Sequence, residues 1–490
     1  MTSLESGIDP GLAALADAIL IPPFPGTTPP PWILQALERG LAGVTLFGPN
    51  VVGDTVALSA ALRSAAAVEP VIAIDEEGGD VTRVAYAEGS PYPGNAALGV
   101  VDDVALTRDV YAAIGGDLAR LGINLNLAPC ADVLVAGGSA VVGTRSFGSD
   151  PGLVARHVTA AVAGLQGAGV AACAKHFPGH GSTAADSHLA LATVSGTIDD
   201  VRARDLPPFS AAIAGGTLAV MPGHLVVPEL TGDLPATLSA AAITGLLRGE
   251  LGFDGAVICD ALEMKAASAT LGIPGAAVLA VRAGVDLLCL GRDTDEEMYH
   301  AVRTALVDAV ESGQLTADRV AEAADRVATL RAWLASAREN DGAGAPDAAE
   351  GAAIGLLAAR RALRKSGPVP SSLVDPLVIE VEPEENMAAG RFTWGFARWA
   401  EVRRVDPAAG DGAAAGSIIT AAEGRPLVLA VRHGAGALPL VNELLGARPD
   451  AIMVDMGAPA WTPPPGTAYL ATCGASRACA QAAAEALGLA

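Results

Sequence analysis

Basic residues are scarce in this chain. Its 490 residues include 31 Lys and Arg against 54 Asp and Glu, which gives a formal net charge of −23. Nucleic acids and anionic membrane surfaces select proteins with basic patches, so this balance disfavours both kinds of binding. We therefore expect neither nucleic acid nor a membrane surface as a partner.

The chain also lacks the marks of secretion and of membrane insertion. Its N-terminus, MTSLESGIDPG, has no basic segment followed by an apolar core, so we expect no signal peptide. No run of about 18 apolar residues occurs. The six cysteines are scattered, and four lie in apolar, strand-like runs, which predicts buried thiols and no disulfide framework. These absences together predict a soluble, cytoplasmic protein in a reducing compartment.

Apolar residues are abundant, at 51% of the chain against 17% for charged residues. This composition supports a large core, and the length suggests two domains. Short apolar runs alternate with helical patterns, which predicts parallel strands joined by crossover helices. The runs are Ala18–Phe24, Gly43–Phe47, Pro70–Ile74, Ile123–Pro129, Val170–Ala174, Leu218–Met221, Gly255–Cys259 and Val285–Leu290. Eight strands in roughly 330 residues favour a (β/α)8 TIM-like barrel over an open doubly wound sheet, since no phosphate-binding glycine loop follows the first run.

The composition changes after the last helical pattern of the predicted barrel. We predict a catalytic barrel over residues 1–337, a polar linker rich in Gly and Ala over residues 338–351, and a smaller α/β sandwich domain over residues 352–490. Strand-like runs in that domain lie at residues 377–381, 426–431, 451–455 and 468–472. Its conspicuous polar group, Arg432-His433-Gly434, is expected to pack at a domain face.

The stretch KHFPGHGSTAADSH, residues 175–188, holds three of the chain's seven histidines. The apolar run before it ends at FPGHG, so we interpret it as a buried strand that breaks into a loop. Asp186 lies two residues before His188, where a carboxylate can hydrogen-bond one ring nitrogen and leave the other for proton transfer. An isolated Asp-x-His pair is common and usually has no function. No Cys-x-x-Cys pair stands at metal-ligand spacing here, and we expect no metal.

Polar residues follow several of the predicted strands, at the ends where a barrel places its chemistry. They are Asp75 and Arg83 after the third run, Arg145 after the fourth, Lys175 and His176 at the fifth, His224 after the sixth and Asp260 after the seventh. Any one of them alone reads as an ordinary strand-end residue. Their joint occurrence predicts a site at one end of a barrel.

Five segments resemble glycoside hydrolase family 3 in their order and spacing, and within it the NagZ-type β-N-acetylhexosaminidases. The segments are IDEEGGDVTR, GTRSFGSDP, KHFPGHGSTAADSH, VMPGHLVVP with the later PATLS, and CDALEMKA. The resemblance covers the predicted barrel and extends more weakly to the C-terminal domain of two-domain members. It implies an exo-acting retaining enzyme that releases β-linked N-acetylglucosamine from glycosides such as peptidoglycan fragments, during recycling of the wall.

The resemblance also implies roles for individual residues. Asp260 would be the nucleophile, and His188, backed by Asp186, the general acid/base. The residues expected to bind the sugar are Asp75, Arg83, Arg145, Lys175 and His176. Two positions depart from the family's pattern: Cys259 stands where Ser or Thr is frequent, and Asp80 stands where a basic residue is frequent. Because Asp80 is acidic, it counts against a specific preference for anionic muropeptides.

These residues support a double displacement without a metal or an organic cofactor. A carboxylate forms the glycosyl-enzyme, and His188 takes the place of the second carboxyl that usually protonates the leaving oxygen. The ordinary His pKa of about 6.5 suits proton transfer in both directions at neutral pH. A neutral His does not repel phosphate, so a phosphorylase is the second hypothesis. A broad β-glucosidase-like enzyme, an inactive sugar-binding protein and a metal-dependent hydrolase barrel are further alternatives.

Overall fold

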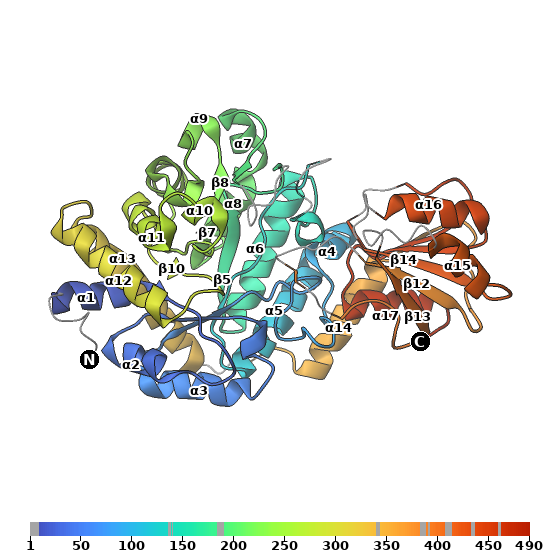
Figure 1. The fold of residues 1–490 in the computed structure, drawn as a ribbon, viewed down its shortest axis with the longest axis horizontal. Coiled ribbons are helices and arrows are strands. Elements are labelled where there is room, and N and C mark those ends of the chain that lie inside the picture. The colour runs from blue at the N-terminus through green and yellow to red at the C-terminus, as the bar shows by residue number, and fades with distance from the viewer. Residues whose placement is uncertain are drawn as a thin grey trace. The chain divides into compact units, whose positions relative to one another are not determined.

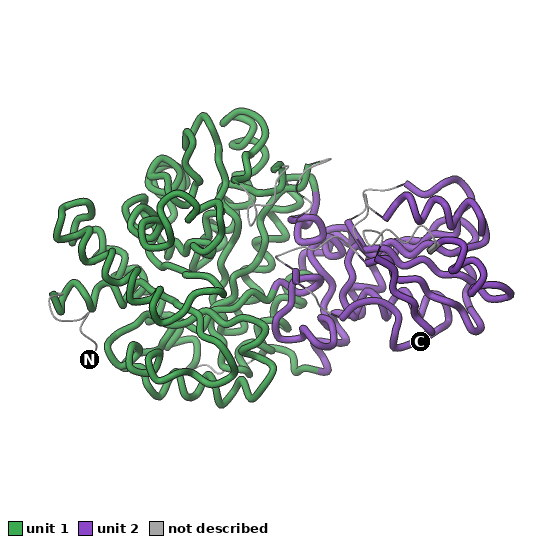
Figure 2. Tube along the Cα trace, in the orientation of Figure 1, with its two compact units in different colours: residues 1–76, 107–139, 149–348 green, residues 77–106, 140–148, 349–490 purple. Residues whose placement is uncertain are grey.

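A computed structural model describes residues 9–135, 139, 141–183, 191–339, 344–382, 389–390, 393–406, 414–432, 437–458 and 462–490. The chain forms two compact units, which Figure 2 draws in different colours. Unit 1 comprises residues 1–76, 107–139 and 149–348, and unit 2 comprises residues 77–106, 140–148 and 349–490. The domain limits of 1–337, 338–351 and 352–490 stay predictions; unit 2 also takes in two segments from the N-terminal half of the chain.

Unit 1 contains a ring of eight parallel strands. Six form one sheet in the order β2-β3-β4-β5-β7-β9, and β1 pairs with β10. The strands are β1 (Leu20–Ile21), β2 (Gly43–Leu46), β3 (Val71–Ile74), β4 (Leu125–Asn126), β5 (Ala171–Phe177), β7 (Ala219–Pro222), β9 (Ala256–Val257) and β10 (Leu288–Cys289). A hydrogen bond of 3.3 Å from Thr45 N to Pro22 O joins β2 to the end of β1, and a bridge between Ile258 and Leu287 joins β9 to β10. The predicted (β/α)8 barrel is confirmed, and each of the eight predicted runs overlaps one strand.

The barrel strands are mostly apolar runs because helices cover their outer side (Figure 1). Side chains fill the interior of a closed barrel of eight strands. All four residues of β3, for example, are buried. The helices of this part of the chain are α1 (Pro10–Asp17), α2 (Pro31–Arg39), α3 (Thr55–Ala65), α5 (Val104–Arg120), α6 (Pro151–Gly167), α7 (Ile198–Arg204), α8 (Leu206–Ala214), α9 (Pro228–Thr231), the π-helix η4 (Ala241–Glu250), α10 (Lys265–Ser268), α11 (Gly272–Ala283), α12 (Glu296–Glu311) and α13 (Ala317–Glu339). Side-chain caps set where several of them begin: Asp150 accepts from Leu153 N at the start of α6. The start of α7 is fixed by a capping box formed by Thr197 and Asp200.

Unit 2 is built on a six-stranded sheet in the order β11-β16-β15-β14-β12-β13, in which only β11 is antiparallel to its neighbour. The strands are β11 (Arg364–Ser366), β12 (Leu377–Val381), β13 (Glu401–Val405), β14 (Leu427–Val431), β15 (Ile452–Asp455) and β16 (Ala468–Ala471). The helices are α4 (Asn95–Val101), α14 (Ala348–Ala362), α15 (Ala414–Ala421), α16 (Leu438–Ala447) and α17 (Arg477–Ala486). The four predicted strand-like runs match β12, β14, β15 and β16, whereas β11 and β13 were not predicted.

Alternation along the central strands divides the interior of unit 2 into two apolar layers. Leu377 and Ile379 of β12 belong to one buried cluster with Val441 of α16, while Val378 belongs to a second cluster with Ala483 of α17. Successive strand residues point to opposite faces of a sheet, so helices on both faces are needed to cover β12. This explains why β12 and β14 read as apolar throughout.

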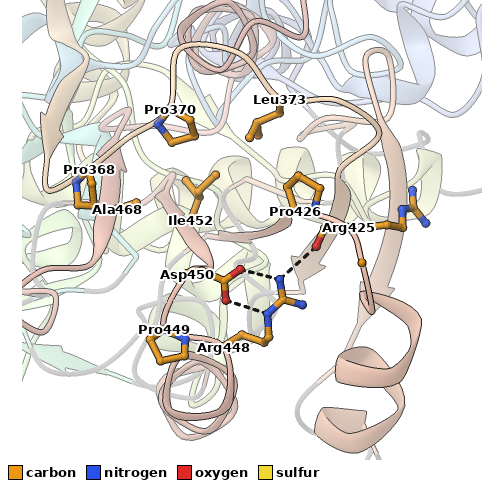
Figure 3. A pocket seen from close by; sticks show the side chains of 11 residues that line it. Pro368, Pro370, Leu373, Arg425, Pro426, Arg448, Pro449, Asp450, Ile452 and Ala468 are labelled. Atoms are coloured by element: carbon orange, nitrogen blue, oxygen red, sulfur yellow. Dashed lines mark hydrogen bonds and ion pairs between the residues drawn. The ribbon is translucent and has the colours of Figure 1, made fainter.

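A cavity of about 540 Å³ lies in unit 2 at the amino ends of its parallel strands. Pro426, Asp450 and Ala468, at or just before the starts of β14, β15 and β16, contribute to its lining. Figure 3 shows that Arg448 in this cavity is held by Asp450 and by the carbonyl oxygen of Arg425. Ligands of open α/β sheets bind at the carboxyl ends of the strands. The position of this cavity and its already paired arginine therefore do not mark it as an active site.

Among the described residues, no single helix is both long enough and apolar enough to cross a membrane, although one bent pair, Pro228–Leu238 with Ala241–Glu250, meets the length and composition criteria jointly.

Candidate active site

Three of the predicted site residues of unit 1 stand at the carboxyl ends of barrel strands. Asp75 directly follows β3, Lys175 is part of β5, and Asp260 follows β9. The Lys175 Nζ donates a hydrogen bond of 2.6 Å to Asp75 Oδ1. The side chain of Lys175 is 3% exposed and that of Asp75 is 23% exposed, so the pair is buried on the lysine side and open on the carboxylate side. A partly open ion pair at this end of a barrel is suited to binding a polar ligand.

Two buried thiols indicate that Asp260 lies near this pair. Burial raises the pKa of the Cys173 thiol; the charge of Lys175 lowers it, and the charges of Asp75 and Asp260 raise it. Burial likewise raises the pKa of Cys289 to about 12, and the same two carboxylates add to this shift. A charge alters a pKa in this way only from nearby. The structure therefore brings Asp75, Lys175 and Asp260 to one region of the barrel interior.

The backbone that follows Asp260 is fixed on both sides. Asp260 Oδ1 accepts a hydrogen bond of 2.8 Å from Ala261 N. The imidazole of His224, which is fully buried, donates from Nε2 to the carbonyl oxygen of Ala261 at 3.0 Å. His224 was recognised in the sequence only as a strand-end residue. In the structure it holds the peptide next to the predicted nucleophile.

His176 is oriented by Asp132, a residue that the sequence interpretation missed. Asp132 Oδ2 lies 2.8 Å from His176 Nδ1, and Asp132 Oδ1 accepts from the backbone N of His176 at 3.2 Å and of His180 at 2.7 Å. Burial acts to raise the pKa of Asp132, but His176 and then His180 and Cys130 lower it to about 2. The carboxylate holds the Nδ1 proton, which points the opposite ring nitrogen, Nε2, away from Asp132. A signal was available, because an aspartate soon after a barrel strand is a candidate for such a role.

Cys130, Asp132 and His176 also bring three possible metal-ligand atoms within 4.8 Å of one another. Cys130 Sγ and His176 Nδ1 each lie 2.8 Å from Asp132 Oδ2. Tetrahedral zinc, with bonds of about 2.0 to 2.3 Å, separates its ligand atoms by roughly 3.3 to 3.7 Å. The observed separations are those of hydrogen bonds, so this cluster fits a buried hydrogen-bonded network better than a metal centre.

The predicted acid/base His188 and its partner Asp186 lie outside the described residues, so their roles stay predictions. The residues on either side are described. Upstream, Thr183 Oγ1 lies 2.7 Å from His180 Nδ1. Downstream, the short strand β6 (Ala192–Thr193) pairs with β8 (Leu225–Val226), which follows β7. The upstream flank of residues 184–190 is thus held by a local side-chain contact, and the downstream flank pairs with the chain that follows β7.

Arg83 and Arg145, predicted to bind the sugar, belong to unit 2. Arg145 is buried, and its Nε and Nη2 donate to the two carboxylate oxygens of Glu77 at 2.8 and 2.7 Å. Arg83 Nη1 lies 3.5 Å from Ala389 O. The acidic departure Asp80 is buried and accepts from Thr144 Oγ1 and Ala475 N at 3.0 and 2.8 Å. Glu77 therefore positions Arg145, and Asp80 accepts hydrogen bonds from residues of its own unit. Sugar binding by Arg83 and Arg145 stays a prediction.

All six cysteines, which lie within the described residues, are buried and form no disulfide. Burial raises the pKa of Cys259, next to Asp260, well above the ordinary thiol value. Its Sγ accepts from Cys289 N at 3.2 Å. Cys259 is thus a buried neutral group in the barrel wall, as the sequence pattern predicted for the cysteines.

Ionisable groups gathered at the carboxyl ends of the strands of a (β/α)8 barrel define an enzyme of the barrel class. Residues 36–330 match the family described as "Glycosyl hydrolase family 3 N terminal domain". This match spans more than half of the chain, and the chain belongs to glycosyl hydrolase family 3. The protein is accordingly a glycoside hydrolase.

Similar proteins agree with this family. A "Beta-hexosaminidase A" of Pseudoalteromonas piscicida is 33% identical over 336 residues, which are 63% of this chain and 56% of that protein. A "Beta-hexosaminidase" of Stenotrophomonas maltophilia is 38% identical over 285 residues, which cover 55% of this chain and 84% of the relative. The solved structure of a family 3 β-N-acetylglucosaminidase from Paenibacillus sp. str. FPU-7 is 30% identical, with a TM-score of 0.85 over 98% of this chain and 97% of that one. The two-unit architecture is therefore shared along nearly the whole chain.

Proposed function

We propose that this protein is a retaining exo-β-N-acetylglucosaminidase acting on small glycosides. The observation that carries the proposal is the arrangement of Asp75, Lys175 and Asp260 in the barrel interior. The whole-chain similarity to a family 3 β-N-acetylglucosaminidase supports this sugar specificity. Peptidoglycan fragments that carry a non-reducing N-acetylglucosamine are the proposed natural substrates.

In the first step, Asp260 attacks the anomeric carbon and forms the glycosyl-enzyme, while His188 gives a proton to the leaving oxygen. In the second step, His188 takes a proton from water, whose oxygen attacks the same carbon and releases Asp260. Two inversions at this carbon return the β-configuration. Asp186 orients the imidazole in both steps.

The described residues give physical support to the binding part of this scheme. Asp75 exposes part of its carboxylate and can accept hydrogen bonds from sugar hydroxyls, with its direction fixed by Lys175. His176, held by Asp132, presents a fixed imidazole edge next to Lys175.

A panel of aryl β-glycosides, containing the N-acetylglucosaminide, the glucoside and the xyloside, tests the proposal. Each is assayed with and without millimolar phosphate. We expect the N-acetylglucosaminide to react fastest, and free N-acetylglucosamine to be the sole sugar product in both conditions. Sugar 1-phosphate as the main product would make the protein a phosphorylase, and a faster glucoside would make it a β-glucosidase-like enzyme.

The cytoplasm is the proposed location, on the grounds of the six buried thiols. Fractionation of cells that express the full-length protein tests this point. Activity recovered with the membrane or outside the cell would contradict it.

A further inference from the structure

We infer that Arg204, oriented by Asp205, is a positioning residue that ties together the two flanks of residues 184–190 and so sets the place of His188. The part that concerns His188 rests on the proposed function. The part that concerns the flanks rests on described contacts alone.

Arg204 contacts both flanks with the same nitrogen. Its Nη2 donates to Ser182 Oγ at 2.9 Å on the upstream side and to the carbonyl oxygen of Ser195 at 3.1 Å on the downstream side. Between these two contacts, Thr183 and Val194 form an antiparallel bridge. The base of the segment is therefore closed by one backbone bridge and one guanidinium.

Asp205 fixes the direction of that guanidinium. Arg204 Nε donates to both oxygens of Asp205 at 3.2 Å, and Nη2 donates to Oδ2 at 2.7 Å. Asp205 is fully buried at the start of α8, whereas the Arg204 side chain is 22% exposed at the end of α7. A planar guanidinium paired in this two-pronged way has little freedom to turn, so its remaining donor capacity points at the flanks.

Asp205 also touches the loop that begins the segment. A Cβ at Gly179 would stand 2.6 Å from the Asp205 Cβ, so glycine is needed there for the two to lie so close. Burial raises the pKa of Asp205 to about 6, against the lowering effect of Arg204, and the charge of Asp132 adds to the rise. Arg204 is thus the partner that keeps this buried carboxylate ionised at neutral pH.

Each flank is also held by a hydrogen bond from its own backbone. The upstream flank is held where Asp132 accepts from His180 N, and the downstream flank where Val194 N donates to Val226 O at 2.9 Å. Joining the ends of a loop reduces the positions open to the residues within it. An acid/base must reach hydrogen-bond distance of its substrate, and misplacement by about 1 Å costs roughly a hundredfold in rate.

The flank contacts are tested by hydrogen exchange of the intact protein. In Arg204→Gln, we expect faster exchange in the peptide that covers residues 183–194 and unchanged exchange in the strands of unit 2. The matched control is Arg202→Gln, because Arg202 lies on the same helix but pairs with the exposed Glu250. Equal exchange of this peptide in the wild type and in Arg204→Gln would overturn the inference.

The effect on His188 is tested with substrates that differ in leaving group. Arg204→Gln is expected to lower kcat/KM about tenfold more for alkyl than for dinitrophenyl N-acetylglucosaminides, because only the former need protonation. Adding Arg204→Gln to His188→Ala should then cause little further loss for either substrate. Fully additive losses, or equal losses for both leaving groups, would show that Arg204 acts through general stability and would overturn the inference.

Two further variants keep the inference testable if Arg204→Gln does not fold. Ser182→Ala removes one flank contact and leaves the Arg204–Asp205 pair intact, so it should reproduce the exchange and leaving-group effects at smaller size. Arg204→Lys keeps the charge but loses the two-pronged geometry, so it should fall between Gln and the wild type. A wild-type pattern in both variants would overturn the inference. If His188→Ala lowered kcat/KM equally for alkyl and dinitrophenyl substrates, that result would instead count against His188 as the acid/base.

Discussion

Both units bury a sheet of mostly parallel strands under helices, yet they use charged side chains differently. In unit 2, Glu380 lies within β12, is fully buried, and accepts from Phe396 N at 2.6 Å and from Arg404 Nε at 3.1 Å. In the barrel, Lys175 is equally buried, but the Asp75 carboxylate that it contacts stays partly open. The buried Glu380 is therefore matched by hydrogen bonds within unit 2, whereas Asp75 in the barrel pairs with Lys175 and still keeps part of its side chain exposed.

Asp455 shows the same contrast at a strand end of unit 2. It accepts from Gly457 N at 3.0 Å and from the Tyr469 hydroxyl at 2.9 Å, and burial followed by the Asp455 charge raises the pKa of Tyr469. A carboxylate at the end of a parallel strand is thus not a site by position alone. It becomes a candidate when it gathers other ionisable groups and keeps exposed surface, as Asp75 does.

The largest effect that follows from this contrast is the loss of the nucleophile. Asp260→Ala should lower kcat about a thousandfold or more while the protein stays folded, because the covalent intermediate cannot form. Glu380→Gln in unit 2 is the matched control and should keep kcat near the wild-type value. A fluorinated slow substrate should label the peptide that contains Asp260. Near wild-type turnover in Asp260→Ala would remove that residue from the nucleophile role.

The next effect concerns the acid/base. His188→Ala should lower kcat/KM by roughly a hundredfold or more for poor leaving groups and far less for activated aryl ones, since only the former need a proton. Asp186→Ala should show a milder version of the same pattern. Both variants are compared by steady-state kinetics on alkyl and dinitrophenyl N-acetylglucosaminides. Equal losses for the two substrates would indicate a binding or folding defect.

A smaller effect is expected in stability against pH. The pKa of Asp132 is about 2 in the folded protein, below its ordinary value, so its ionised form favours folding above pH 4. This contribution, about 2 kcal/mol, should be lost as the pH falls from 4 to 2. Asp132→Asn should lack it, which denaturant unfolding at several pH values would measure.

Asp205 supplies a contrast of opposite sign. Its pKa is raised to about 6, so its contribution to folding is present below pH 4 and is lost as the pH rises through 6. Asp205→Asn should remove this opposite dependence and leave that of Asp132 in place. The same pH dependence in both variants as in the wild type would contradict these two assignments.

The smallest effect concerns the sugar's N-acetyl group. We expect kcat/KM for the N-acetylglucosaminide to exceed that for the glucoside at least tenfold, or about 1.4 kcal/mol, the worth of one well-placed amide contact. Parallel assays on the two p-nitrophenyl glycosides measure this ratio. Comparable values would place the enzyme among broad β-glucosidase-like members of the family.

The sequence by itself determined the barrel and part of its site. Buried parallel strands read as continuous apolar runs, so all eight could be predicted, and the residues just after them, Asp75 and Asp260, follow directly. Strand β13 (Glu401–Val405) was not predicted from the sequence, because it is an edge strand that pairs on one side only and carries charged residues. Pairing in the folded sheet, and not an apolar pattern, defines it.

Only the tertiary structure decided which residues serve the predicted ones. Asp132 and His176 are 44 residues apart in sequence, and Arg204 and Ser182 are 22 apart, so no local pattern links either pair. Pairing of β4 with β5 in the barrel brings the ends of these two strands together. The start of α8 places Asp205 in contact with Gly179. Local patterns report which residues are buried, whereas side-chain partners depend on distances that exist only once the strands have closed into a ring.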